Sequence, residues 1–249
     1  MSPILILSFI LQIACCVHVV RTGRPLYWIF ILLLFSYLAV LIYFIAEILP
    51  DLRNGPGSRK VARKVRNALD PQRDKRRAEQ NLQLSDTQAN RRELAAESLR
   101  HGDYRRAAEL YQGALKGLYA TDPDLMLGLA KAQYGLGQPR QARETLDALI
   151  AANPDFRSKE GHLLYAKAVE GTGDVAAALH EYEAVVQGYP GEEARLRYGQ
   201  LLKRNGDTAR AAELFKEILA RSAVAPRYYQ REQRDWIEAA RQELSALGA

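Results

Sequence analysis

Cysteine is almost missing from this chain of 249 residues. The only two, Cys15 and Cys16, are adjacent and lie inside an apolar stretch. They cannot build a disulfide framework or supply a metal site on their own. The sequence therefore excludes a small domain held together by disulfides, and it is compatible with a reducing environment.

Recognised catalytic motifs are also lacking. The sequence has no glycine-rich phosphate loop before a basic residue, no paired cysteine or histidine at metal-ligand spacing, and no nucleophile with a base in a known motif. A lone histidine such as His162, on a predicted helix, more often packs or faces solvent than reacts. We therefore expect a protein that is not an enzyme and that uses no metal and no cofactor.

Hydropathy and charge are unevenly distributed along the chain. The mean hydropathy of −0.26 averages a nearly apolar stretch over residues 1–50 and a mostly polar remainder. Residues 1–92 hold 14 basic against 6 acidic residues, a net charge of +8, whereas residues 93–249 have a net charge of −2. The basic character belongs to the N-terminal part and not to the rest.

Two apolar segments within residues 1–50 predict a transmembrane hairpin. As helices, residues 4–20 would extend about 26 Å and residues 26–49 about 36 Å, enough to cross a bilayer. A cleavable secretion signal fits the first segment poorly, because Met1-Ser2-Pro3 carries no basic residue. A helical hairpin buried in a soluble core is the less favoured alternative.

Basic residues near the segment ends indicate the orientation of this hairpin. Arg21 and Arg24 lie between the two apolar segments, whereas residues 51–77 carry ten basic residues. Because positive charge is retained on the cytoplasmic side, we expect a multi-pass protein of a bacterial inner membrane whose remaining part faces the cytoplasm.

Residues 51–87 are interpreted as a basic juxtamembrane linker. Within it, Val61, Val65 and Leu69 fall on one face of a short amphipathic helix. The basic residues around that face are candidates for contact with anionic lipid: Arg59, Lys60, Arg63, Lys64 and Arg66. That these charges only set topology and stay solvated is equally well supported. Nucleic-acid binding is not expected, because no aromatic residue interrupts the charges for base stacking.

The N-terminal segment resembles that of a known family. Arg21, Pro25, Trp28 and the pair Tyr43-Phe44, spread over two short apolar segments, are similar to the membrane segment of cardiolipin synthases and related phospholipase-D-type proteins. Those enzymes need a His-x-Lys-x4-Asp motif, and none of the four histidines here is followed two positions later by lysine. The resemblance therefore implies an anchor without the chemistry.

The rest of the chain repeats with a period near 34 residues. Glycine recurs at Gly102, Gly137, Gly173 and Gly206, and alanine at Ala107, Ala142, Ala178 and Ala211, each alanine followed four residues later by Tyr111, Leu146, Tyr182 or Phe215. Glycine permits a tight turn after a first helix, alanine lets two helices approach closely, and the large residue fills the space between hairpins. The spacing predicts stacked helical hairpins.

This pattern resembles the tetratricopeptide repeat over residues 88–223. Small residues stand where the family has its early glycine, at Ala95, Ala130, Ala166 and Gly199, while the family's first-helix tryptophan is replaced by Arg91, Met126, His162 and Arg195. Residues 224–249, with Tyr229 and Trp236 at helical spacing, are expected to form a capping helix. The predicted fold is all-α: a two-helix transmembrane hairpin, an α-solenoid of about four repeats and a C-terminal capping helix.

In this family the first helices of successive hairpins line a groove that receives peptides or helices. The resemblance implies a groove here formed by Arg92, Arg100, Leu127, Lys131, Tyr134, Leu163, Lys167, Leu196, Gln200 and Lys203. Its three leucines would form an apolar stripe, with Lys131 and Lys167 beside it. Such a surface suits a partner with apolar and acidic features. That the lysines merely keep a helical face soluble is an equally good interpretation.

The favoured function is a membrane-anchored adaptor that binds protein or peptide partners at the cytoplasmic face of a bacterial inner membrane. The alternative is a non-catalytic accessory protein of cardiolipin-type phospholipid metabolism, or a protein that binds anionic lipid. Both assign the chain to binding and neither to catalysis.

Overall fold

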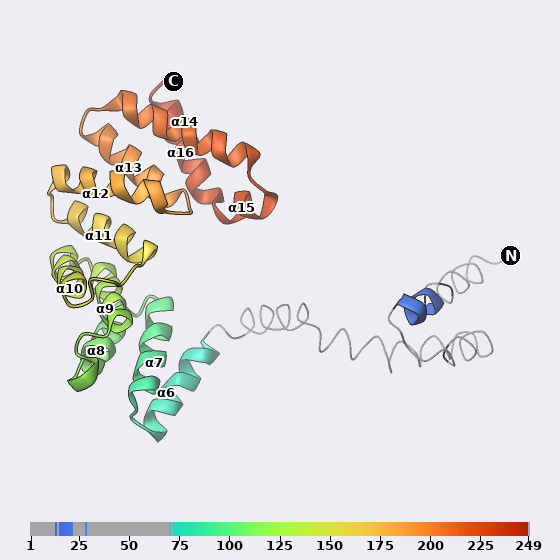
Figure 1. Cartoon of the computed structure of the whole chain (residues 1–249), viewed down its shortest axis with the longest axis vertical. Helices are drawn as coiled ribbons and strands as arrows, with labels where there is room; N and C mark the ends of the chain where they lie inside the picture. The colour runs from blue at the N-terminus through green and yellow to red at the C-terminus, as the bar shows by residue number, and fades with distance from the viewer. Residues whose placement is uncertain (1–12, 14, 22–27, 29–69, 71, 249) are drawn as a thin grey trace. The chain divides into compact units, whose positions relative to one another are not determined.

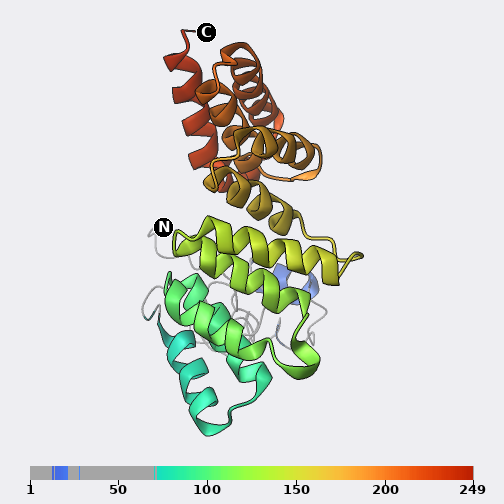
Figure 2. The same cartoon turned by 90° about the vertical axis from the view of Figure 1, so that its left-hand side faces the viewer.

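The computed structural model describes residues 13, 15–21, 28, 70 and 72–248, and every regular element in these ranges is helical. The chain divides into two compact units, residues 1–73 and residues 74–249 (Figure 1). The second unit is an array of helices that follow one another in chain order (Figure 2). The predicted all-α solenoid is confirmed.

Four helical hairpins form the body of the array. They pair α7 (Gln88–Arg100) with α8 (Tyr104–Ala114), α9 (Pro123–Gly135) with α10 (Pro139–Ala152), α11 (Lys159–Gly171) with α12 (Val175–Gly188), and α13 (Glu193–Arg204) with α14 (Thr208–Val224). A short 3-10 helix, η2 (Gly117–Tyr119), joins the first two hairpins. The second helix of each hairpin contacts the first helix of the next, so the apolar core runs through all four.

The turn inside each hairpin uses a glycine in the left-handed region. The φ angles of Gly102, Gly137, Gly173 and Gly206 are 74°, 73°, 89° and 91°. In three of the four turns an aspartate follows, and its side chain accepts a hydrogen bond from a backbone N–H of the next helix: Asp103, Asp174 and Asp207. The periodic glycines therefore mark turns and begin the second helices.

Small residues allow the helices of the array to pack closely. The alanines predicted for the second helices, Ala107, Ala142, Ala178 and Ala211, are fully buried, and so are Tyr182 and Phe215. A Cβ atom at Gly199 would lie 2.6 Å from Cε1 of Phe215, and one at Gly128 would lie 2.4 Å from Cζ of Tyr111. Each large ring thus fills the space that a missing side chain leaves open on the facing helix.

An additional helix precedes the first hairpin. Helix α6 (Arg73–Leu84) lies in the stretch that the sequence assigned to the basic linker, residues 51–87. Its Ala78 is fully buried in the core of the first hairpin, and the Lys75 Nζ atom lies 2.8 Å from Oδ2 of Asp103. Helix α6 therefore covers the N-terminal end of the array, and the linker ends before it.

Two helices, and not one, cover the C-terminal end. Helix α15 (Arg227–Glu232) is separated from α16 (Arg234–Ala246) at Gln233, whose side-chain oxygen accepts a hydrogen bond from the backbone N–H of Glu192 at 2.9 Å. The Tyr229 hydroxyl donates to the Glu192 carboxylate at 2.6 Å. Ile237 and Ala240 of α16 are buried in the core of the last two hairpins. The segment thus covers the end of the array. The break at Gln233 leaves Gln233 and Tyr229 hydrogen-bonded to Glu192, just before α13.

The predicted transmembrane hairpin and amphipathic linker helix fall almost entirely outside the described residues. Residues 15–21 are helical, and both cysteines are free thiols. Within the described ranges, no helix is both long and apolar enough to cross a membrane.

Replacing Gly173 by alanine tests the turn chemistry. Because the left-handed conformation is unfavourable for a residue with a Cβ atom, the free energy of unfolding should fall by about 1 to 2 kcal/mol. Urea unfolding followed by circular dichroism measures this change. Gly188, exposed at the end of α12 without a positive φ, is the matched control. Its alanine variant should be as stable as the wild type or slightly more stable, and an equal loss in both variants would contradict the turn assignment.

Candidate partner-binding groove

The first helices of successive hairpins lie side by side through contacts between charged and aromatic side chains. Arg92 of α7 pairs with Asp124 of α9 at 2.8 Å, and Lys167 of α11 lies over the ring of Tyr134 of α9, 5.3 Å from its centre. The Lys167 ammonium also donates to Glu193 of α13 at 3.0 Å. Side-chain contacts therefore link all four first helices, each to the next.

The predicted apolar stripe is not part of that surface, and this expectation is wrong. Leu127, Leu163 and Leu196 expose 8%, 4% and 2% of their area. All three belong to the hydrophobic core, where they pack among buried residues of first and second helices. The groove consequently presents polar, charged and aromatic groups rather than a leucine stripe.

Lys167 is the centre of a compact charged cluster. The carboxylate of Glu193 accepts hydrogen bonds from Lys167 and from Arg197, the latter at 2.8 Å. Burial on its own would raise the pKa of Glu193, but the two cations outweigh it and hold that pKa below its ordinary value. This cluster fixes the Lys167 side chain against Tyr134.

Lys131 lies one hairpin earlier in the same register as Lys167. It is partly buried and has no hydrogen bond or ion pair among the described residues. Its neighbour Tyr134, one turn further along α9, is also partly buried. Of the two predicted lysines, Lys131 is thus the one with an unoccupied ammonium group.

The ends of the predicted groove are occupied by the chain itself. Gln200 and Lys203 donate hydrogen bonds to the two carboxylate oxygens of Glu243 on α16, at 2.9 and 2.8 Å. The bond from Lys203 lowers the pKa of Glu243 more than partial burial raises it. At the other end, Arg92 pairs with Asp124, and Arg100 pairs with Glu97 of its own helix. Between these ends, on α9, the Lys131 ammonium is the group without a partner among the described groove residues.

Sequence reasoning missed the carboxylates of this surface. Glu170 accepts a hydrogen bond from the buried Tyr182 hydroxyl at 2.6 Å and pairs with Arg204. It has the same repeat register as Tyr134 and Lys203, so the periodicity could have identified it. Glu193 and Asp124 likewise lie three residues before the groove leucines. The groove is therefore mixed in charge and not predominantly basic.

The remaining predicted sites have no described geometry or no candidate ligands. The lipid-contact residues Arg59 to Arg66 lie outside the described residues. Among the residues that the structure describes, no group of three or more His, Cys, Asp or Glu side chains could hold a metal ion.

Two models of the tetratricopeptide repeat match the chain, one over residues 98–168 and the other over residues 163–226. Together they span residues 98–226, more than half of the sequence, from the end of α7 to the end of α14. The chain is a tetratricopeptide-repeat protein. Arrays of this family are scaffolds that bind protein or peptide partners.

Solved structures show the same fold at low sequence identity. MamA from Desulfovibrio magneticus RS-1, residue 41 to the end, is 19% identical, with a TM-score of 0.55 over 67% of this chain and 95% of that chain. A double mutant of MamA RS-1 is also 19% identical, with a TM-score of 0.52 over 64% of this chain and 88% of that chain. No curated protein matches this chain.

Replacing Lys167 by methionine tests the charged cluster. A carboxylate whose folded pKa is depressed adds stability above its unfolded pKa, and that stability is lost as pH falls through the folded pKa. Without Lys167 the pKa of Glu193 should rise. When the pH is lowered from 7 to about 3, the free energy of unfolding of the variant should therefore fall by about 1 kcal/mol less than that of the wild type. Urea unfolding at both pH values measures the difference.

The matched control for this measurement is Lys131→Met. Lys131 occupies the same register without a carboxylate partner, so its variant should keep the acid dependence of the wild type. Identical acid dependence in both variants would show that Lys167 does not set the pKa of Glu193.

Proposed function

We propose that this tetratricopeptide-repeat protein is a membrane-anchored adaptor that binds protein or peptide partners at the cytoplasmic face of a bacterial inner membrane. The observation that carries the proposal is a capped array whose first-helix cations Arg92, Lys167 and Lys203 are paired with carboxylates, while the Lys131 ammonium, one turn from Tyr134, has no partner among the described residues. It provides a place to bind a polypeptide, and the described residues offer no catalytic cluster.

The contact between the groove and α16 supports an acidic partner. Glu243 of that helix is held by Gln200 and Lys203, which occupy the registers of Lys131 and Tyr134 in the second hairpin. The chain itself thus places a carboxylate of a helix against this register. We infer that a partner segment places a carboxylate at Lys131 and an apolar or aromatic group beside Tyr134, with the charge contributing mainly to the association rate.

The N-terminal segment supports the membrane location. Residues 4–20 and 26–49 are long and apolar enough in sequence to span, and ten basic residues follow them in residues 51–77. Anchoring would confine the array to a layer near the bilayer and so raise the local concentration of any partner that is also at the membrane.

A second candidate function rests on the basic cluster from Arg59 to Arg66 and on the resemblance of residues 1–50 to cardiolipin-synthase membrane segments. In that case the chain assists phospholipid enzymes or binds anionic lipid, and the array assembles the complex. Enrichment of cardiolipin or lipid-synthesis enzymes with the purified full chain would favour this function, and soluble clients unrelated to lipid would favour the adaptor.

Membrane anchoring is tested by fractionation of the full chain. Because two apolar helices in a bilayer are not displaced by salt or alkali, the protein should stay in the membrane pellet after carbonate washing. A chain lacking residues 2–50 is the control and should move to the supernatant, since residues 74–249 form a compact unit of their own. Release of the intact full chain by carbonate would rule out the anchor.

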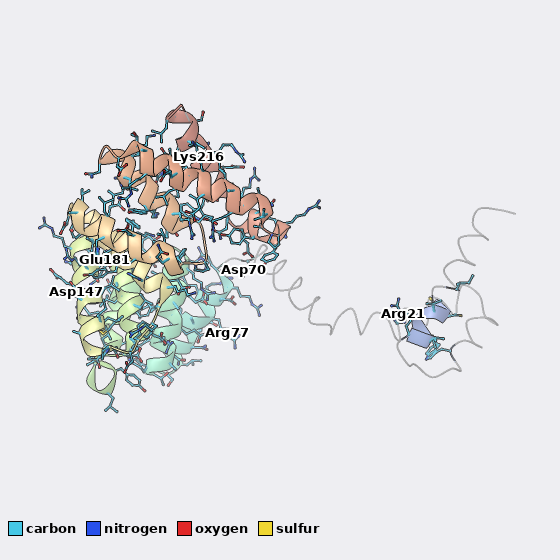
Figure 3. All side chains as sticks on the ribbon, turned by 45° about the horizontal axis from the view of Figure 1, so that its top comes forward. Arg21, Asp70, Arg77, Asp147, Glu181 and Lys216 are labelled. Atoms are coloured by element: carbon cyan, nitrogen blue, oxygen red, sulfur yellow. The ribbon has the colours of Figure 1, made fainter. Side chains whose placement is uncertain are left out.

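The groove is tested by partner recovery from crosslinked membranes. The double variant Lys131→Ala and Lys167→Ala should recover at least about fivefold less of the partners that the wild type recovers, measured by quantitative mass spectrometry. Lys216→Ala is the control, because Lys216, labelled in Figure 3, is an exposed lysine on the second helix α14 and belongs to no first helix. Equal recovery with all three proteins would mean that the groove lysines serve only solubility.

A further inference from the structure

One repeat position of the first helices has a different environment in the third hairpin than in the other three. It is occupied by Arg91, Met126, His162 and Arg195 in the four hairpins. In the first and last, the arginine reaches a backbone carbonyl of a second helix: Arg91 donates to Gly113 and Arg195 to Val186, both at 3.1 Å. In the second, Met126 is buried. Three of the four side chains therefore fill the space between helices.

His162 leaves that space unfilled. Its side chain is 45% exposed, and its only charged neighbour is Glu181 of α12, with 3.4 Å between Nε2 and Oε2. Beside it lies a pocket of about 520 Å³ between the C-terminal half of α10, the α10–α11 loop and α11. This volume lies in the range of sites that enclose a large side chain or a small ligand.

The walls of the pocket are apolar. Leu127, Leu146, Leu149 and Phe156 line it, and Ile150, which is 54% exposed, lies at its edge. Leu127, which was predicted to form part of the apolar stripe of the groove, thus lines this pocket instead. An apolar group placed here would be stabilised in proportion to the area that it removes from water.

The polar side chains around the pocket favour a positively charged neighbour. Asp147 and Glu181 both line it, and both are labelled on the same side of the array in Figure 3. Asp147 accepts a hydrogen bond from Tyr165 at 2.8 Å, and Arg143 lies 3.9 Å away. Glu181 lies 3.4 Å from His162 and has no ion pair with a lysine or arginine among the described residues. The one lining arginine, Arg157, donates to the carbonyls of Pro154 and Phe156 in its own loop, at 2.5 and 3.2 Å.

We propose that this pocket binds one aromatic side chain of a partner polypeptide, with a lysine or arginine next to it facing Glu181 and Asp147. The apolar walls select the ring, and the two carboxylates select the flanking charge. The exposed Ile150 at the edge extends the contact surface beyond the pocket, which suits a polypeptide. The inference deepens the proposed adaptor function by adding a contact outside the groove, and it assigns the partner a second, basic feature.

Two capped dipeptides provide matched probes. Acetyl-Trp-Lys-amide and acetyl-Trp-Glu-amide carry the same ring and differ only in the flanking charge. Binding to the full chain in detergent micelles is measured by ligand-observed saturation-transfer NMR titration. The Trp-Lys probe should bind about three- to fivefold more tightly than the Trp-Glu probe, the preference expected of partly exposed charge pairs.

Two variants test the assignment of the site. His162→Trp should fill the pocket and abolish binding of both probes, and circular dichroism checks that the variant folds. Glu181→Gln keeps the shape and should remove most of the preference for the Trp-Lys probe while retaining binding of the ring. Lys216→Ala on α14 should behave as the wild type in both respects.

Three results would overturn the proposal: equal affinity for the two probes, unchanged binding by a folded His162→Trp variant, or loss of binding in the Lys131→Ala and Lys167→Ala variant. The last result would place the probe in the groove. These outcomes are independent of the membrane test, since dipeptide binding to purified protein does not require the anchor or a natural partner to be identified.

Discussion

The array depends on one repeated packing arrangement, in which a large ring or leucine of a second helix fits against a position where the neighbouring first helix has almost no side chain. Phe215 against Gly199 and Tyr111 against Gly128 leave no space for even one additional carbon atom. The buried alanines at the same register of the second helices allow the approach. Tyr111 and Gly128 lie on successive hairpins, so their contact limits how closely α8 and α9 approach, whereas Phe215 and Gly199 fix the approach of the two helices within the fourth hairpin.

That surface is shaped as much by its ends as by its repeats. Helix α6 covers the first hairpin with Ala78, and α16 covers the last with Ile237 and Ala240. A solenoid needs such caps because its terminal hairpins would otherwise expose a core face. The C-terminal cap also contacts α13, where the Glu243 carboxylate accepts hydrogen bonds from Gln200 and Lys203. Capping therefore engages the groove residues of the fourth hairpin within the chain itself.

The repeat geometry was predictable from sequence, and the orientation of individual side chains was not. Glycines at positive φ and buried alanines recur at a fixed spacing, so periodicity alone located the hairpins and their turns. The predicted leucine stripe is wrong because each first helix has both a groove face and a core face. A step of one residue turns the side chain by about 100° around the helix axis, which is enough to move it from one face to the other. Helix α6 was not predicted from the sequence, because only one of its side chains, Ala78, is buried and the remaining residues resemble a charged linker.

Charge pairing explains why the site is confined to so few groups. Residues 93–249 are nearly neutral overall. Arg92 and Lys167 of the first helices meet a carboxylate of the next hairpin, and Lys203 meets one of the capping helix α16. Paired charges hold the hairpins in register but are partly neutralised toward a ligand. Among the described residues, the Lys131 ammonium of α9 has no such partner, and a separate pocket is lined by Asp147 and Glu181. A partner that used both features, as we propose, would need acidic and basic groups at the matching spacing, so its selectivity would depend on that spacing more than on the strength of either contact.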